Sequence, residues 1–168
     1  MTIAYTFLES PFGKVLVAWG DRGLVRVGIR GDSERPEPGW RLDRNLDCAA
    51  TRQLREYFAG DRRSFDLPRV LDGTPFRIEV WRALERIPFG ETASYAQVGE
   101  RVGSPKASRA VGLACAANPL PIVVPCHRVI GTNGKLVGFG GGLDMKRAML
   151  SFEKSLAPKA SVVGALGL

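Results

Sequence analysis

A cysteine and a histidine stand side by side in the segment Pro125-Cys126-His127-Arg128-Val129. A free thiol has a pKa of about 8.5, so only about 3% of it is the nucleophilic thiolate at neutral pH. His127, the single histidine of the chain, could act as the base that increases this fraction. Neighbouring side chains of an extended segment point to opposite faces. We therefore expect either that Pro125 bends the chain or that a water molecule links the thiol to the imidazole.

A catalytic imidazole also needs a group that fixes its tautomer, and a carboxylate is the usual one. The sequence predicts a last helix, capped by Asp144, whose inner face carries Met145, Met149, Phe152 and Leu156. Glu153 lies one turn after Met149, at the margin of this face, and is the best-placed carboxylate. A buried cysteine beside a buried histidine without any catalytic role would give the same local sequence, so these residues alone leave both interpretations open.

Metal and disulfide chemistry fit the cysteines poorly. Cys48, Cys115 and Cys126 are separated by 67 and 11 residues. Structural zinc sites usually use cysteine pairs two to four residues apart, and a disulfide framework needs more cysteines. We expect no metal and no cofactor.

The elements that would position these residues belong to a chain of ordinary globular composition. It has 168 residues, of which 45% are hydrophobic and 24% charged, which excludes wholesale disorder. No apolar run approaches the roughly 18 residues of a membrane span. The N-terminus lacks the basic and apolar regions of a signal peptide. We expect a cytoplasmic protein that does not associate with membranes.

The charge is distributed unevenly. The formal net charge is +7, with +1 on residues 1–72 and +6 on residues 73–168. A basic half of this kind favours a polyanionic partner, of which nucleic acid is the commonest. Basicity that serves only solubility remains the alternative.

The N-terminal half predicts a small α/β module over residues 1–72. Alternating apolar residues and turn signals indicate three antiparallel strands, at about 3–9, 14–19 and 24–30. A loop follows over 31–39, and helical spacing of apolar residues predicts a helix over 43–59. A polar linker over about 60–73 separates this module from the rest.

The C-terminal half, residues 73–157, predicts a mainly helical domain. Thr74 and Pro75 begin one helix, Ser94 caps a short helix over 95–102, and Ser104-Pro105 caps another that ends at Asn118. The short pair, joined by a turn at Gly103, has the outline of a helix-turn-helix. A β-branched run follows over 122–129, and then a loop with six glycines over 131–142. The fold class is therefore α/β (α+β), and residues 158–168 are predicted to be a flexible tail.

The second helix of the pair has an exposed face of small residues. If Ala107, Val111 and Ala114 face the core, the opposite face carries Arg109, Gly112 and Ala116, with Ser108 at its edge. A major-groove reader would present Arg, Asn or Gln to the base edges. Small residues and one arginine instead favour close, shape-based contact in the minor groove. Packing of this face against another helix is the alternative.

The segment from Pro125 to Val129, continued by Ile130 and Gly131, resembles the active-site segment of the O6-alkylguanine-DNA alkyltransferases. These proteins are also called methylated-DNA–protein-cysteine methyltransferases. The resemblance covers residues 74–156, about half of the chain, with the segments in the family's order and spacing. The other matching segments are Phe76-Arg-Ile-Glu-Val-Trp81, Ile87-Pro-Phe-Gly-Glu91, Ser94-Tyr95, Pro105-Lys-Ala-Ser-Arg-Ala-Val-Gly112, Asn118-Pro119, Gly141-Gly142-Leu143 and Glu153. The N-terminal half resembles the family only in outline.

The resemblance implies that the damaged base is flipped out of double-stranded DNA into a pocket of the protein. Arg109 would fill the space that the base leaves, and Tyr95 would donate its phenolic hydrogen to the guanine. Asn118 would tie the helix-turn-helix to the cysteine segment, while the carbonyls of Cys126 and Val129 and the amide of Gly140 would bind the base. The remaining implied contacts are with DNA for Ser94, Ser108, Ala110 and Gly112, and with the pocket for Pro125 and Phe139.

The implied reaction is direct and irreversible repair of DNA. Glu153, His127 and an ordered water would deprotonate Cys126, and the thiolate would take the alkyl group from O6-alkylguanine, or from O4-alkylthymine. The resulting thioether cannot be hydrolysed, so each molecule would act once, without a cofactor. The implied partner is DNA containing O6-alkylguanine, bound through the minor groove by a monomer. Cooperative binding along DNA stays open.

Two positions depart from the family pattern, and three other functions fit the sequence less well. Phe139 stands where many members have Tyr, and Gly140 where some have Ser; the zinc site of the animal members is not expected here. A lesion-binding sensor without catalysis is the alternative function, but such proteins lack the nucleophile that Cys126 provides. A cysteine hydrolase would leave Arg109 without a role. A DNA-binding regulator would require base-reading side chains.

Overall fold

The computed structural model describes residues 2–157, and its N-terminal half is built on a four-stranded sheet. Strands β1 (Ala4–Leu8), β2 (Val15–Gly20) and β3 (Gly23–Gly28) form an antiparallel meander, as predicted. The first turn is set by Ser10, whose hydroxyl accepts from the Phe12 N–H at 3.1 Å. The strand order is β3-β2-β1-β4, so β2 is central and most of its residues are buried on both faces.

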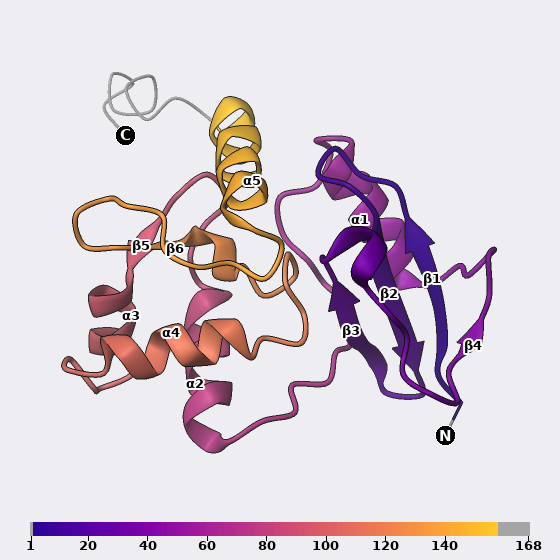
Figure 1. Cartoon of the computed structure of the whole chain (residues 1–168), viewed down its shortest axis with the longest axis horizontal. Helices are drawn as coiled ribbons and strands as arrows, with labels where there is room; N and C mark the ends of the chain where they lie inside the picture. The colour runs from indigo at the N-terminus through magenta and orange to yellow at the C-terminus, as the bar shows by residue number, and fades with distance from the viewer. Residues whose placement is uncertain (1, 158–168) are drawn as a thin grey trace.

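The helix of this half begins later than its apolar spacing predicts. Helix α1 spans Ala49–Phe58 rather than 43–59, because the Asp43 carboxylate accepts from the Asn45 N–H at 3.0 Å and closes a turn. The residues before that turn form a fourth strand, β4 (Arg41–Leu42), which pairs in parallel with β1. A single 3₁₀ turn, η1 (Gly31–Ser33), lies in the loop that follows β3. In Figure 1, α1 lies against the sheet.

Up to residue 157, the C-terminal half contains four helices and little strand. Its helices are α2 (Pro75–Leu84), α3 (Tyr95–Arg101), α4 (Ser108–Ala116) and α5 (Leu143–Leu156). Two short segments, β5 (Ala93–Ser94) and β6 (Val129–Ile130), pair in parallel beside the 3₁₀ turn η2 (Cys126–Arg128). Figure 1 shows this half packed beside the sheet, with α5 (yellow) standing upright in the upper middle of the view.

Helices α3 and α4 form the predicted helix-turn-helix. Ser94 caps α3 by accepting from the Gln97 N–H at 3.0 Å, and the Gln97 side chain accepts from the Ser94 N–H at 2.9 Å. The turn folds back onto Gly99 of α3, where a β-carbon would lie 2.8 Å from the Ser104 carbonyl oxygen, so this helical position requires glycine. The prediction that Ser104-Pro105 caps α4 is wrong: Ala107 N–H donates to the Ser104 carbonyl in a separate turn, and α4 begins at Ser108.

Helix α5 has a different start and a different inner face from those predicted. Gly142, with a φ of 95°, is its N-cap, whereas Asp144 lies exposed in the first turn beside Arg147. The fully buried residues of α5 include Lys146 and Glu153, while Phe152 and Leu156 are only partly buried. Two charged side chains therefore share the inner face of α5 with Met145 and Met149, which are buried as predicted.

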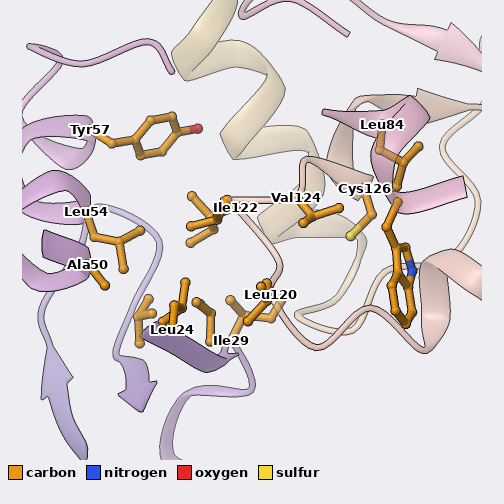
Figure 2. Packing of buried hydrophobic residues seen from close by; sticks show 14 of the residues in the cluster. Leu24, Ile29, Ala50, Leu54, Tyr57, Leu84, Leu120, Ile122, Val124 and Cys126 are labelled. Carbon is orange, nitrogen blue, oxygen red and sulfur yellow. The ribbon is translucent and has the colours of Figure 1, made fainter. Parts of the chain in front are cut away.

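One hydrophobic core joins the two halves. The segment 119–124, which leads into the active-site turn, runs between them, and Val27 of β3 donates its N–H to the Pro119 carbonyl at 2.9 Å. Figure 2 shows Leu120 and Ile122 of this segment between side chains of the N-terminal half and those near Cys126. The position of Cys126 thus depends on contacts with both halves.

Two sequence-based expectations concern features beyond this core. Residues 158–168, for which a flexible tail was predicted, lie outside the described residues. In the part of the chain that the structure describes, no helix is both long enough and apolar enough to cross a membrane.

Candidate active site

The reactive segment is a tight turn rather than an extended strand. Cys126–Arg128 forms one 3₁₀ turn that Pro125 introduces with a ψ of 66°. A bend at Pro125 was one of the two alternatives that the sequence left open. The Arg128 N–H donates to the Pro125 carbonyl at 3.0 Å. Upstream, Ile122 has a φ of 77°, a conformation that is costly for a β-branched residue and is held here by complete burial. Because of this bend, the side chains of Cys126 and His127 do not have to point to opposite faces, as neighbouring side chains of a strand do.

Glu153 lies at the centre of a buried polar cluster behind this turn. Its carboxylate accepts from His127 Nε2 at 2.6 Å and from Arg128 Nε and Nη2 at 2.8 and 3.1 Å. The Tyr57 hydroxyl, at 2.5 Å, and the Gly90 N–H, at 3.3 Å, complete the set of donors. Burial alone would raise the pKa of Glu153, but its hydrogen bonds and charge contacts with His127 and Arg128 outweigh burial and keep that pKa below its ordinary value. Glu153 is therefore ionised.

His127 is fully buried, and its two ring nitrogens have different surroundings. Burial lowers the pKa of His127, although the neighbouring Glu153 opposes that shift. A neutral imidazole that faces an ionised carboxylate carries its proton on Nε2, so Nδ1 presents a lone pair. Within residues 2–157, Nδ1 has no hydrogen-bonding partner. It is thus a buried acceptor available to a water molecule or to the neighbouring thiol.

Tyr57 comes from the other half of the chain, and sequence reasoning did not assign it to the site. It lies on α1, 96 residues before Glu153, within the stretch 43–59 whose apolar spacing predicted a helix. Burial, followed by the charge of Glu153, raises the pKa of the Tyr57 phenol, so it remains a donor. Figure 2 shows its hydroxyl pointing away from α1. The only available signal was a hydroxyl group at an inner helical position.

Cys126 is almost completely buried, and its surroundings act in opposite directions on its pKa. Burial raises the pKa of the thiol, while a hydrogen bond from Asn118 and the positive charge of Lys146 oppose that rise. Asn118 also donates to the Val124 carbonyl at 2.9 Å and accepts from the Leu120 N–H at 2.9 Å. It therefore connects the end of α4 to the segment that carries the cysteine.

Lys146 is the second residue that sequence reasoning missed. It is buried on α5, and its ammonium donates to the carbonyls of Val137 and Gly138 at 3.2 and 3.3 Å. It also lies 5.8 Å from the centre of the Tyr95 ring. Burial lowers the pKa of Lys146, and the two nearby thiols, Cys126 and Cys115, oppose this shift. Its position on the inner stripe, seven residues before Glu153, was the available signal.

A cavity of about 700 Å³ opens in front of Cys126. One wall is α4 and the other is the glycine-rich loop, so the small residues of the α4 face border open space rather than a packed helix. Leu113, 61% exposed, stands on the α4 side. The lining residues are Arg30, Tyr95, Ser108, Arg109, Gly112, Leu113, Cys115, Ala116, Cys126, Thr132, Val137, Gly138, Phe139 and Gly140.

The structure brings only some of the predicted binding residues to this cavity. Tyr95, Ser108, Arg109, Gly112, Phe139 and Gly140 line it together with Cys126. The other predicted binding residues do not line this cavity. Ser94 caps α3, and Ala110 is half-buried on α4. Asn118 lies behind the cysteine, and Pro125 and Val129 are buried.

The Tyr95 phenol remains protonated at the wall of the cavity. Its hydroxyl donates to the Val137 carbonyl at 2.8 Å. Burial, followed by the nearby thiols of Cys115 and Cys126, raises the pKa of Tyr95 to about 12. A protonated phenol at this position can donate a hydrogen bond to a bound ligand.

Metal binding has no evident basis here. Among residues 2–157, no group of three or more His, Cys, Asp or Glu side chains is arranged to hold a metal ion. The chemistry available to the site is that of a thiol, an imidazole and a carboxylate.

Sequence profiles of two domains together match most of the chain. Residues 75–155 match "6-O-methylguanine DNA methyltransferase, DNA binding domain", and residues 3–69 match "6-O-methylguanine DNA methyltransferase, ribonuclease-like domain". Two similar relatives bear the name methylated-DNA–protein-cysteine methyltransferase. The one from Methanosarcina acetivorans is 46% identical over 90% of this chain and 98% of its own length. The one from Mycobacterium tuberculosis is 46% identical over 93% of this chain and 95% of its own length.

Solved structures give the same result. The crystal structure of Mycobacterium tuberculosis O6-methylguanine methyltransferase superposes with a TM-score of 0.84 at 43% identity, covering 96% of this chain and 99% of that one. A structure of the M. tuberculosis protein in complex with DNA superposes with a TM-score of 0.84 at 44% identity, covering 92% and 95% of the two chains.

Proposed function

The chain belongs to the 6-O-methylguanine DNA methyltransferase family, whose members repair DNA by alkyl transfer, and we propose that it moves the alkyl group of O6-alkylguanine to its own Cys126. The observation that carries this assignment is the position of Cys126. Its side chain lines the cavity between α4 and the glycine-rich loop, while His127 and the ionised Glu153 lie directly behind it. A nucleophile, a base and an orienting carboxylate thus meet at a site of ligand size.

The damaged base reaches Cys126 by leaving the DNA stack. A sulfur atom that lies inside a cavity cannot touch the O6 position of a stacked guanine, so the nucleotide has to rotate into the protein. Arg109 lines the mouth of the cavity on the exposed face of α4, where a long planar cation can occupy the vacated space among the phosphates. The small residues beside Arg109 allow the backbone of α4 to approach the minor groove.

The reaction is a displacement at the alkyl carbon. The Cys126 proton passes through a water molecule to Nδ1 of His127, which is a free acceptor in the structure. The Glu153 carboxylate stabilises the imidazolium that forms. The thiolate then forms the S–C bond as the C–O6 bond breaks, and the electron pair of that bond moves onto the guanine. Tyr95 donates a hydrogen bond to the leaving base, which it can do because its phenol is protonated.

The thioether product has no route to hydrolysis, so each molecule acts once. We include O4-alkylthymine as a second substrate because its reacting carbon is likewise bound to an exocyclic oxygen of the base. The protein acts as a monomer and contacts DNA through α4.

The test is stoichiometric transfer from duplex DNA that carries O6-[methyl-³H]methylguanine. We expect one labelled methyl group per protein molecule, located on the peptide that contains Cys126. Replacement C126S abolishes transfer, whereas C48S, at a buried cysteine at the start of α1, serves as the control and retains it. Label on another residue, or more than one transfer per molecule, contradicts the proposal. Lesion binding without any transfer would identify a sensor instead.

A further inference from the structure

A second cavity reaches Cys126 from the side of the N-terminal half. It has a volume of about 280 Å³ and extends between β3 and the segment after α4. Five residues line both cavities: Arg30, Cys115, Ala116, Cys126 and Gly140. The larger cavity, the one proposed to receive the base, and this smaller one therefore meet at the reactive cysteine. The proposed function uses only the larger one.

The geometry of a displacement reaction gives the smaller cavity a use. In the transition state the sulfur, the reacting carbon and the leaving oxygen lie on one line, so every other group on that carbon points sideways. The reacting carbon of a methyl group carries only hydrogen atoms, so a methyl group needs no additional space beside the sulfur. A longer substituent needs space that opens beside the sulfur, away from the base. The smaller cavity provides such a space, because it is lined by Cys126 and Gly140 but not by Tyr95 or Arg109.

The charges around the smaller cavity favour an anion. Its lining includes Arg26, Arg30 and Glu34. Arg26 forms an ion pair with Glu34, and the same carboxylate accepts from the Arg30 backbone N–H at 3.1 Å, so the charge of Glu34 is already engaged. The Arg30 guanidinium makes no hydrogen bond or ion pair with any residue among 2–157. It is left as the unmatched charge at the junction of the two cavities.

We propose that the smaller cavity is a subsite for the far end of larger O6 substituents, and that Arg30 selects substituents that end in a carboxylate. This inference rests on the proposed function and adds a substrate class to it. In the transfer, the S–CH₂ bond forms, the CH₂–O6 bond breaks, and the carboxylate stays attached to the carbon beside Arg30. The product is S-carboxymethyl Cys126, with its charge paired to the guanidinium.

The test compares O6-carboxymethylguanine with its neutral isostere, O6-carbamoylmethylguanine, each placed in the same duplex. Single-turnover rates of the unmodified protein and of R30Q give the ratio of the carboxymethyl rate to the carbamoylmethyl rate for each protein. Arg30 is exposed, so we expect R30Q to lower this ratio about fivefold, the size of a partly solvated charge pair. R41Q removes an exposed arginine of β4 that lies outside both cavities, and it should leave the ratio unchanged.

A second variant, R30E, reverses the charge and is expected to increase one rate, which a misfolded protein would not do. R30E should lower the ratio further and should increase the rate with the cationic O6-(2-aminoethyl)guanine, relative to the unmodified protein. Equal slowing of all substrates in R30Q would mean that Arg30 binds a DNA phosphate, and it would overturn the subsite. Transfer from O6-methylguanine in the same series tests the proposed function separately: if no substrate alkylates Cys126, the function fails, and if only the ratio stays constant, the subsite fails.

Discussion

Replacement Y57F isolates the contribution of the N-terminal half to the active site. The substitution removes one hydroxyl and keeps the ring, which packs against Phe58, Phe65, Phe89 and Phe152. The lost hydrogen bond joins a buried phenol to an ionised carboxylate at 2.5 Å, and bonds of this kind contribute about 1.5–3 kcal/mol. Four other donors to Glu153 remain, so we expect the lower end, about 1.5 kcal/mol, as the decrease in the free energy of unfolding.

The same substitution should change the titration of His127. Tyr57 and His127 both contact Oε2 of Glu153, so removing the phenol leaves more negative charge on the oxygen that faces the imidazole. A larger negative charge favours the imidazolium and should raise the pKa of His127 above that of the unmodified protein. Because the chain has a single histidine, ¹⁵N-edited NMR reports this titration without assignment problems.

The control for this substitution is Y5F, since Tyr5 is a half-buried residue of β1 whose hydroxyl makes no hydrogen bond to residues 2–157. Its free energy of unfolding should change by less than about 0.5 kcal/mol. Urea unfolding measures both variants. If Y57F matches Y5F in stability and leaves the histidine titration unchanged, the phenol does not support the catalytic carboxylate and our account of Glu153 is wrong.

Three further substitutions test the remaining parts of the site. R109A should markedly slow repair of O6-methylguanine in duplex DNA while changing the reaction with free O6-benzylguanine little; equal losses would rule out a role for Arg109 in filling the DNA stack. E153Q should raise the pKa of the Cys126 thiol, seen as a shift of the rate–pH curve to higher pH, and it leaves Arg128 without its buried counter-ion, which costs about 3–5 kcal/mol of stability. The pKa of Glu153 is lower in the folded protein, so this stabilisation is complete above the unfolded-state pKa of about 4.3 and is lost progressively as the pH falls below it, through the folded-state pKa. The difference in stability between the two proteins should therefore shrink as the pH falls below about 4.3. K146M should raise the pKa of Cys126 because it removes a positive charge that opposes the effect of burial, and iodoacetamide alkylation as a function of pH measures this shift.

Local signals in the sequence predicted the elements whose ends are set by their own side chains. The caps at Thr74 and Ser94 and the turn set by Ser10 depend on neighbouring residues, and the strands and helices next to them have the expected positions. The start of α1 was predicted too early because Asp43 binds its own backbone, which apolar spacing does not reveal. The β-branched residues over 122–129 favoured an extended chain and Pro125 a bend, so the sequence left the conformation at Cys126 open. Burial between the two halves holds the segment in the bent conformation.

Helical periodicity predicted the part of the candidate site that lies on α5. The spacing on α5 placed Glu153 near the inner face, and the structure puts its carboxylate against His127. Tyr57 and Lys146 were missed for a common reason: a phenol and an ammonium at inner helical positions are informative only once their distant partners are known. Those partners are a carboxylate 96 residues away and two loop carbonyls.

The order of the residues along the chain has a consequence for biosynthesis. The ribosome makes the thiol before it makes the carboxylate, because Glu153 lies on the last described helix, 27 residues after Cys126. While the nascent chain is still emerging, His127 has no acidic partner and Arg128 no counter-ion. The sulfur therefore gains its activating groups only when α5 docks, so the newest part of the chain completes the site around the older part.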